Sequence, residues 1–290
     1  MSLFRLLLFS LFTAATVFAA KPNVIIIYVD DMGYGDASCL NPQAKFQTPN
    51  IDRLAGEGMT FTDGHSPDTV CTPSRYGLLT GRYSWRTTMK RGVMGAEGAC
   101  LITEGRMTLA SFLRDNGYTT GMVGKWHLTG YKYQGAHFEI RPQDHGFDWN
   151  IGSEVKGVGN GANFWPYVFR TQPISWIDLP KNRMGEDEYL TDRLNLEAVD
   201  FVERNQDKPF FLYLSHYAPH TILNGRPDLV DKYRKKHPPG KTSRTKCYLC
   251  DDAGLSGEDC EYWAQNHNPH LAAMLESIDD GVGLLMEKLD

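Results

Sequence analysis

Polar residues of the kinds used in catalysis follow three apolar runs that lie far apart in the sequence. Asp30 and Asp31 come directly after NVIIIYV. Lys125 and His127 follow TTGMVG, and His220 ends FFLYLSHYAPH. Short apolar runs rich in β-branched and aromatic residues predict buried strands, and α/β sheets bind ligands at the carboxyl ends of such strands. We therefore expect these five side chains at one edge of a sheet.

The adjacent carboxylates of Asp30 and Asp31 predict a bound cation. Two carboxylates at a buried strand end repel each other and lose hydration, so a positive group must offset the cost. A hard divalent cation, which takes oxygen ligands, is the simplest such group. The alternative is that both residues cap the turn DDMGYGD, in which Asp and Gly are common anyway.

Cys71 stands at the expected start of a short helix, after GHSPDTV and before TPSRYGLLTG. Pro73 suits a first helical turn, and a helix N-terminus lowers a thiol's pKa and holds anions. Arg75 adds a permanent charge that can grip an oxyanion. The alternative is a buried structural thiol or one half of a disulfide.

Lys125 and His127 are two residues apart. If the strand continues through GKWH, both side chains point to one face of the sheet. For each histidine the alternative is an ordinary hydrogen-bonded polar residue.

Apolar runs alternate with segments of helical period. This pattern predicts an α/β fold in which helices sandwich a mainly parallel sheet. The continuous β-branched run at 23–31 is expected to be buried on both faces. The expected strands are 23–31, 119–127 and 210–220, and the expected helices are 108–118, 188–209 and 270–290.

The 290 residues are 41% hydrophobic and 22% charged, which suits one large globular domain. Residues 1–20 have one charge, Arg5, then an apolar core and small residues, which predicts a cleaved secretory signal too short to span a bilayer. We expect residues 21–290 to be exported, to a periplasmic, extracellular or lysosome-like compartment, with no membrane span after cleavage. The net charge of −5 argues against nucleic acid as a partner.

From about residue 22 to residue 290 the sequence resembles the formylglycine-dependent sulfatases, within the alkaline-phosphatase-like superfamily. The blocks VDDMGYGD, GKWH and APH occur in the family's order. The resemblance implies that a separate maturation enzyme oxidises Cys71 to formylglycine while the chain is unfolded, recognising Pro73 and Arg75. The family motif C-x-P-S-R-x-x-x-L-T-G is matched by Cys71, Pro73, Ser74, Arg75, Leu79, Thr80 and Gly81.

The resemblance also implies a role for the other candidate residues. Asp30, Asp31 and an oxygen of residue 71 would bind Ca²⁺, with Mg²⁺ as the alternative ion. Arg75 would hold the hydrated aldehyde, and Lys125 would neutralise the sulfate oxygens.

Two histidines are implied as proton carriers. His220 would protonate the leaving alcohol, and His127 would deprotonate the second hydroxyl of the hydrated aldehyde. Ser153, in GFDWNIGSE, is a looser match to a further sulfate-binding position of the family.

One departure from the family concerns the metal. Family members have a later Asp-Asn pair and a Lys beyond the helix that ends here at Asp290. Asp30, Asp31 and residue 71 alone do not reach the six to eight oxygens that are usual around Ca²⁺. The expectation is a truncated N-terminal catalytic domain, 21–290, that is inactive by itself.

Three weaker features leave alternatives open. Cys247, Cys250 and Cys260, near His267 and His270, predict either a zinc site or, preferably, a local disulfide with one odd thiol. The basic run 232–246 is expected to be a loop or insertion, either flanking the pocket near a sulfated glycan or simply solvated. Aromatic residues such as Trp165, Tyr167 and Trp176 either stack on sugar rings or pack in the core.

Three functions remain open. The first, which the ordered motifs favour, is a sulfatase acting on an aryl or carbohydrate sulfate. The second is a phosphatase or phosphonate-ester hydrolase of the same superfamily. The third is a non-catalytic relative that binds sulfated glycan, which an unmodified Cys71 together with retained glycan binding would support.

Overall fold

The computed structural model describes residues 21–94, 99–129, 140–153, 163–167, 179, 182–220, 223–236 and 268–290. The described residues form one sheet of four parallel strands in the order β1-β4-β2-β3. The parallel pairing confirms the expected fold class. The strands are β1 Val24–Tyr28, β2 Thr119–Gly124, β3 Trp149–Ile151 and β4 Phe210–Ser215.

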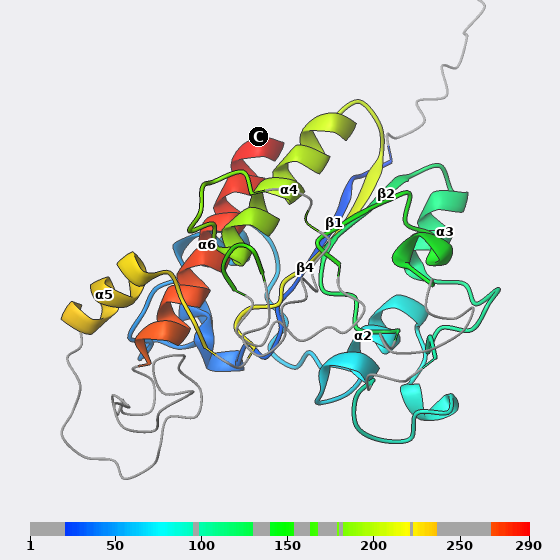
Figure 1. Ribbon diagram of the computed structural model, residues 1–290, viewed down its shortest axis with the longest axis horizontal. Helices are drawn as coiled ribbons and strands as arrows, with labels where there is room; N and C mark the ends of the chain where they lie inside the picture. The colour runs from blue at the N-terminus through cyan, green and yellow to red at the C-terminus, as the bar shows by residue number, and fades with distance from the viewer. Residues whose placement is uncertain are drawn as a thin grey trace, which may run out of the picture.

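Helices cover both faces of this sheet (Figure 1). On one side lie α4 (Leu190–Asn205) and α6 (Pro269–Leu289), and on the other lie α2 (Cys71–Thr80) and α3 (Leu109–Asp115). Two further helices, α1 (Pro49–Glu57) and α5 (Pro227–Lys236), pack against α6.

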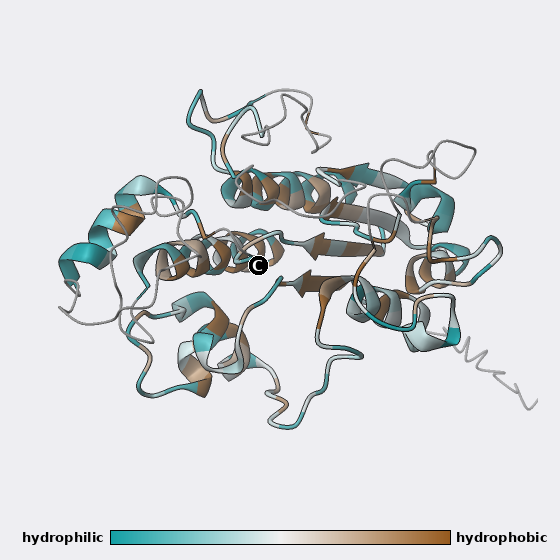
Figure 2. Cartoon of the chain, turned by 60° about the horizontal axis from the view of Figure 1, so that its bottom comes forward, coloured by the Kyte–Doolittle hydropathy of each residue, from teal (hydrophilic) through white to brown (hydrophobic). Residues whose placement is uncertain are grey.

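Strand β4 shows why helices must pack on both faces of the sheet. All six of its residues are buried. Apolar residues of the sheet appear brown in Figure 2. Leu212 and Leu214 pack into the core shared with α4, whereas Phe211 and Tyr213 pack into the core shared with α2. This alternation is the period of two of a strand with both faces buried.

Strand β1 differs from its prediction, because its residues are only half buried. It lies at the edge of the sheet and pairs with β4 alone, from Val24 with Phe211 to Tyr28 with Ser215. Within the described ranges no strand pairs with its other edge. A run of β-branched residues cannot distinguish an edge strand from a central one.

Strand β2 also ends earlier than expected, at Gly124 rather than His127. Gly124 has φ 93°, and a Cβ there would lie 2.1 Å from the carbonyl oxygen of Ser215. The Lys125 N–H donates to that carbonyl over 2.7 Å, and the chain then leaves the strand direction. The strand therefore does not continue through GKWH, which was the condition for Lys125 and His127 to share one strand face.

The three expected helices are confirmed; α3 and α4 are shorter than expected, and α6 is shifted by one residue. Thr108 caps α3 by accepting a hydrogen bond from the Ser111 N–H (3.0 Å), and Gly117 after it has φ 83°. Helices α1 and α5 and strand β3 were not predicted. The loop expected at 232–246 was wrong for 232–236, which form the end of α5, where Lys232 binds Glu276 of α6.

Several predictions fall outside the described residues: the signal peptide 1–20, Trp176, the basic residues after Lys236, and the three late cysteines. His270 lies buried in α6, where its Nδ1 accepts the Gly225 N–H at 3.4 Å. No helix in the described ranges has the length and apolarity to cross a membrane.

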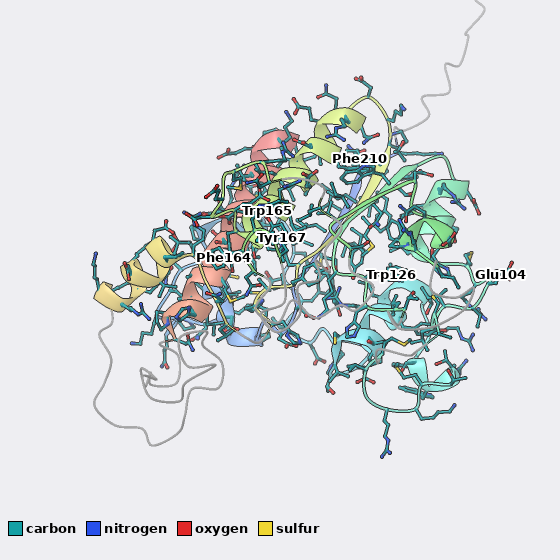
Figure 3. All side chains as sticks on the ribbon, in the orientation of Figure 1. Glu104, Trp126, Phe164, Trp165, Tyr167 and Phe210 are labelled. Atoms are coloured by element: carbon teal, nitrogen blue, oxygen red, sulfur yellow. The ribbon has the colours of Figure 1, made fainter. Side chains whose placement is uncertain are left out.

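The aromatic residues Trp165 and Tyr167 pack inside the protein, as their side chains in Figure 3 illustrate. Tyr167 is fully buried and its hydroxyl donates to Glu188 Oε1 over 2.5 Å. The Trp165 ring packs edge-on against it at 5.6 Å. For these two residues core packing is the correct alternative.

Candidate active site

Asp30, which follows β1, is the centre of the site. Its side chain is 3% exposed and its Oδ1 accepts Arg75 Nη2 at 3.0 Å, while Oδ2 accepts Lys125 Nζ. Its own N–H donates to the Ala218 carbonyl after β4 (3.2 Å). Burial alone would raise the pKa of Asp30, but the charges of Arg75 and Lys125 lower it. The carboxylate is therefore ionised and paired.

Arg75 lies in the first turns of α2 and is completely buried. Its Nη1 donates to the Lys125 carbonyl at 3.0 Å and to Ser215 Oγ, and its Cζ lies 5.1 Å from the centre of the Tyr28 ring. These contacts connect α2 to the ends of β1, β2 and β4. The Nε of Arg75 has no hydrogen-bond partner within the described residues.

Cys71 is the first residue of α2, as predicted, and its thiol is free. It lines a cavity of about 630 Å³ together with Asp30, Asp31, His65 and others. Burial raises the pKa of Cys71, an effect that the nearby Lys125 and Arg75 charges oppose without reversing. The expected lowering of the thiol's pKa by the helix N-terminus was therefore wrong, because desolvation dominates.

Lys125 and His127 are both buried, and burial lowers the pKa of each. For His127 the pKa falls to about 3, with the Lys125 charge as the second cause, so its ring is neutral. His127 Nε2 lies 3.2 Å from the Met94 carbonyl oxygen. A carbonyl can only accept, so Nε2 holds the proton and Nδ1, which has no partner within the described residues, keeps a free lone pair.

Asp31 and His220 lie on the more open side of the site. Asp31 has φ 67° and a side chain 51% exposed, and its Oδ2 is 3.7 Å from His220 Nε2. Asp31 has a left-handed backbone conformation and lines the same cavity as Asp30. As predicted from the strand ends, a residue that follows β1 (Asp31) and one that follows β4 (His220) lie close together.

Ser153 follows β3, the strand next to β2. Its hydroxyl accepts a hydrogen bond from Asn150 Nδ2 at 2.7 Å. It is not among the described residues that line the cavity of Cys71 and Asp30. The structure does not join it to the other candidate residues.

Sequence reasoning missed two residues that hold the site together. Ser215, the last residue of β4, accepts from Arg75 and donates to the Lys125 carbonyl at 2.8 Å. Thr72 donates to the His127 carbonyl (3.0 Å) and accepts the Met94 N–H (2.9 Å). Thr72 directly follows Cys71, and Ser215 lies within the predicted strand 210–220, so a search for hydroxyl residues at strand and helix ends could have found both.

A divalent cation fits the chemistry of this site only in part. Asp30 and Asp31 offer carboxylate oxygens, the donors that Ca²⁺ and Mg²⁺ prefer, on the wall of one cavity with Cys71. Within the described ranges, however, no group of three His, Cys, Asp or Glu is placed to bind a metal.

The parallel sheet between two helical layers, with its site at the strand ends, belongs to the alkaline-phosphatase-like fold. The crystal structure of Ps i-CgsB superposes with a TM-score of 0.68 at 28% identity over 93% of this chain and 55% of that one. A phosphonate monoester hydrolase of Agrobacterium radiobacter shares the fold at 17% identity, with a TM-score of 0.56 over 93% of this chain and 59% of that one.

The chain belongs to the sulfatase family, whose model matches residues 22–290. It is 31% identical to an N-acetylgalactosamine-6-O-sulfatase of Bacteroides thetaiotaomicron over 73% of this chain and 51% of that protein. It is 35% identical to human arylsulfatase A over 73% of this chain and 44% of that protein. The chain thus spans about half the length of the relatives it matches.

Proposed function

We propose that the protein is a sulfuric ester hydrolase that removes sulfate from a carbohydrate or aryl sulfate through a formylglycine made from Cys71. One observation supports this most strongly: Cys71 opens onto a cavity beside a carboxylate that is paired with two buried cations. A sulfate group is an anion, and the charges of Arg75 and Lys125 behind Asp30 favour its binding beside Cys71.

The proposal also needs two groups that translation alone does not supply: a formylglycine at position 71 and a divalent cation. Formylglycine at position 71 would supply, once hydrated, a hydroxyl nucleophile for attack on sulfur. Asp30 and Asp31 would hold Ca²⁺, or Mg²⁺ instead, which would supply Lewis-acid polarisation of the sulfate.

The chain's own residues then bind the sulfate and move protons. Lys125 Nζ neutralises charge on the sulfate oxygens, and Arg75 keeps Asp30 in place for the metal. His127 Nδ1 has the free lone pair needed to take a proton from residue 71. His220, on the exposed side beside Asp31, donates a proton to the leaving alcohol. Ser153 would serve as a further sulfate contact.

Sulfated carbohydrate is the favoured substrate class. Among the similar proteins are an N-acetylgalactosamine-6-O-sulfatase and Ps i-CgsB, which has been solved with a neocarrahexaose. A formylglycine-generating maturation enzyme is the implied partner. Export, expected from residues 1–20, is part of the proposal.

The test combines a mass measurement with an assay on the full-length protein from its native host. The tryptic peptide Leu54–Arg75 should have the mass of formylglycine at position 71. Aryl sulfate should be cleaved faster than aryl phosphate, and Cys71→Ala should lower sulfate release by roughly a thousandfold or more, because the nucleophile is gone.

Cys39→Ser is the matched control, since Cys39 is also a free thiol but lies on the surface. An intact thiol at position 71 in a host that has the maturation enzyme would contradict the mechanism. Faster cleavage of aryl phosphate would favour the phosphatase alternative, and retained glycan binding without turnover would favour the binding protein.

A further inference from the structure

A second cavity, of about 300 Å³, adjoins the one at Cys71. His65 and Ser66 line both cavities, so one loop forms their common wall. Pro67 of that loop packs on Gly77 of α2 so closely that a Cβ at Gly77 would lie 2.5 Å from the Pro67 ring. The wall is thus fixed against the same helix that begins at Cys71.

The far side of the second cavity has an exposed aromatic pair. Tyr83 lines the cavity, and its ring stacks on Trp85 with centroids 4.0 Å apart and planes 11° from parallel. Each residue is 49% exposed, unlike the buried Tyr167. Lys90 Nζ donates to the Trp85 carbonyl at 2.6 Å, which helps hold the short 3₁₀ turn Ser84–Arg86. Such an ordered, solvated aromatic face is suited to contact with an amphipathic ring.

The same segment is strongly basic. Residues 81–94 include Arg82, Arg86, Lys90 and Arg91 and no Asp or Glu. Arg82 lines the second cavity. In the part of the chain that the structure describes, no ion pair is found for Arg82, Arg86 or Arg91. A ligand that reaches this surface is therefore expected to be anionic.

We infer that the second cavity is a subsite for the sugar next to the sulfated one, so that the substrate is an anionic oligosaccharide. The inference rests on the proposed function, because the sulfate to be removed occupies the cavity at Cys71. Tyr83, supported from behind by Trp85, packs against the apolar face of the neighbouring sugar ring. Arg82 binds a carboxylate or a second sulfate on that sugar.

The test compares two substrates of the full-length matured protein. One is 4-methylumbelliferyl sulfate, which has no neighbouring sugar to occupy the second cavity. The other is a panel of tetrasaccharides from chondroitin sulfate, heparin and carrageenan. Tyr83→Ala and Trp85→Ala should each lower the ratio of kcat/KM for the cleaved tetrasaccharide to that for the aryl sulfate by about tenfold, mainly through KM.

Arg82→Gln should lower the same ratio and weaken its dependence on salt, because one screened charge contact is lost. Phe112→Ala, on α3, is the matched control, since Phe112 is also 49% exposed and lies outside both cavities. Its ratio should equal that of the wild type.

The outcomes separate this inference from the proposed function. Unchanged ratios for Tyr83→Ala and Trp85→Ala would overturn the subsite. Aryl sulfate turnover without sulfate release from any tetrasaccharide would also overturn it and leave the sulfatase proposal standing. No turnover of either substrate class would remove the proposed function itself.

Discussion

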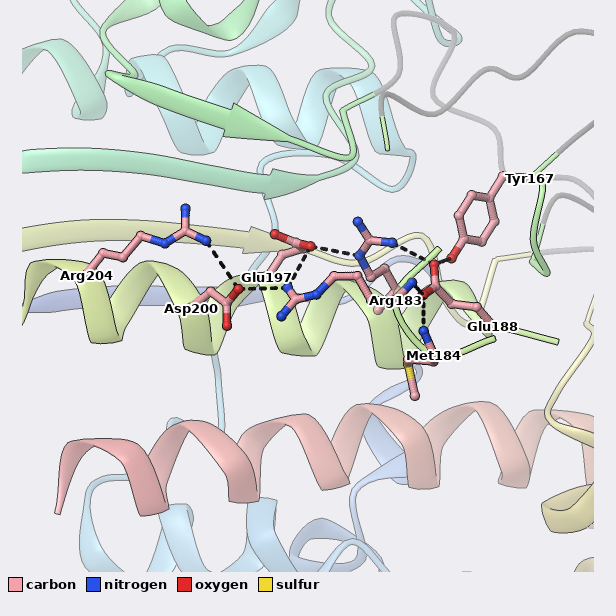
Figure 4. Close-up of polar contacts among 8 residues, drawn as sticks. Tyr167, Arg183, Met184, Glu188, Glu197, Asp200 and Arg204 are labelled. Atoms are coloured by element: carbon pink, nitrogen blue, oxygen red, sulfur yellow. Dashed lines mark hydrogen bonds and ion pairs between the residues drawn. The ribbon is translucent and has the colours of Figure 1, made fainter. Parts of the chain in front are cut away.

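Two ionic clusters lie on the sheet and on α4, and they differ in their charge balance. The cluster on the sheet is buried, whereas the one on α4 is buried at Glu188, Arg193 and Glu197 and reaches the surface at Arg204. In the Asp30 cluster one carboxylate, Asp30, faces two cations, Arg75 and Lys125. In the α4 cluster three carboxylates face three arginines, and Figure 4 shows them as one connected network. The α4 cluster consists of Glu188, Glu197, Asp200, Arg183, Arg193 and Arg204.

The carboxylate at the centre of each cluster shows what this difference means. Glu188 also accepts the Tyr167 hydroxyl (2.5 Å) and the Met184 N–H (2.9 Å), so its oxygens are fully used inside the protein. Asp30 instead gives its oxygens to Arg75 and Lys125 and lines the cavity of Cys71. Glu188 also borders a cavity, but its hydrogen-bonding capacity is used within the protein. A cluster with equal numbers of carboxylates and arginines fixes the fold, whereas a cluster with more cations than carboxylates beside Cys71 is suited to bind an anion for a short time.

Removing the surplus cation should have the largest effect. Lys125→Met should lower kcat/KM for aryl sulfate by about 10²–10³-fold, because charge that develops on the sulfate oxygens loses its partner. The folded state should keep its thermal midpoint within a few degrees, since Asp30 retains Arg75. Steady-state kinetics and calorimetry on the same sample measure both. A large fall in midpoint with unchanged kcat/KM would reverse the roles we assign to the two clusters.

Breaking the α4 cluster should lower stability rather than activity. Glu188→Gln should lower the free energy of unfolding by about 3–5 kcal/mol, because Arg193 is left buried with an incomplete partner. Activity per folded molecule should stay the same. Glu57→Gln is the control, because solvent screens the exposed Arg53–Glu57 pair and its loss should change stability little. Denaturant titration measures the free energy of unfolding of both variants. Equal losses would show that burial of the Glu188–Arg193 pair adds nothing to its effect on stability.

His216, which follows β4, is buried and belongs to neither cluster. Within the described residues neither of its ring nitrogens has a hydrogen-bond partner. Burial lowers its pKa from 6.5 to about 4. The unfolded chain therefore binds a proton more readily, so stability is complete above pH 6.5 and declines as the pH falls towards 4.

We expect His216→Phe to lose about 2 kcal/mol less stability than the wild type between pH 7 and pH 5. Denaturant titrations at the two pH values measure this difference. His127, which is present in both proteins, cancels from the comparison. Parallel pH curves for the two proteins would show that His216 has a proton acceptor or donor after all.

The sequence predicted what local pattern can specify. Apolar runs located β1, β2 and β4, and the rule that ligands bind at strand ends placed Asp30, Lys125 and His220 at one edge of the sheet. The motif around Cys71 gave the family, which the comparison confirms.

Features that depend on contacts between distant segments could not be predicted. The end of β2 at Gly124 depends on the Ser215 carbonyl, and the partial exposure of β1 depends on strand order. The direction of the Cys71 pKa shift depends on burial, which no helix rule contains. For the same reason the sequence could not show that Tyr83 and Trp85 are exposed to solvent while Trp165 and Tyr167 pack inside the protein.

The pairing of β1 with β4 has a consequence for folding during synthesis. Val24 pairs with Phe211, and Arg75 is fixed by Ser215, which is 140 residues further along the chain. At about 5–20 residues per second, that stretch takes on the order of ten seconds to emerge from the ribosome. Until then β1 and β2 are not joined by β4, so α2 lacks the assembled sheet that it packs against in the finished fold. If residue 71 is modified as we propose, the long-range pairing of this sheet leaves Cys71 accessible to the maturation enzyme during synthesis.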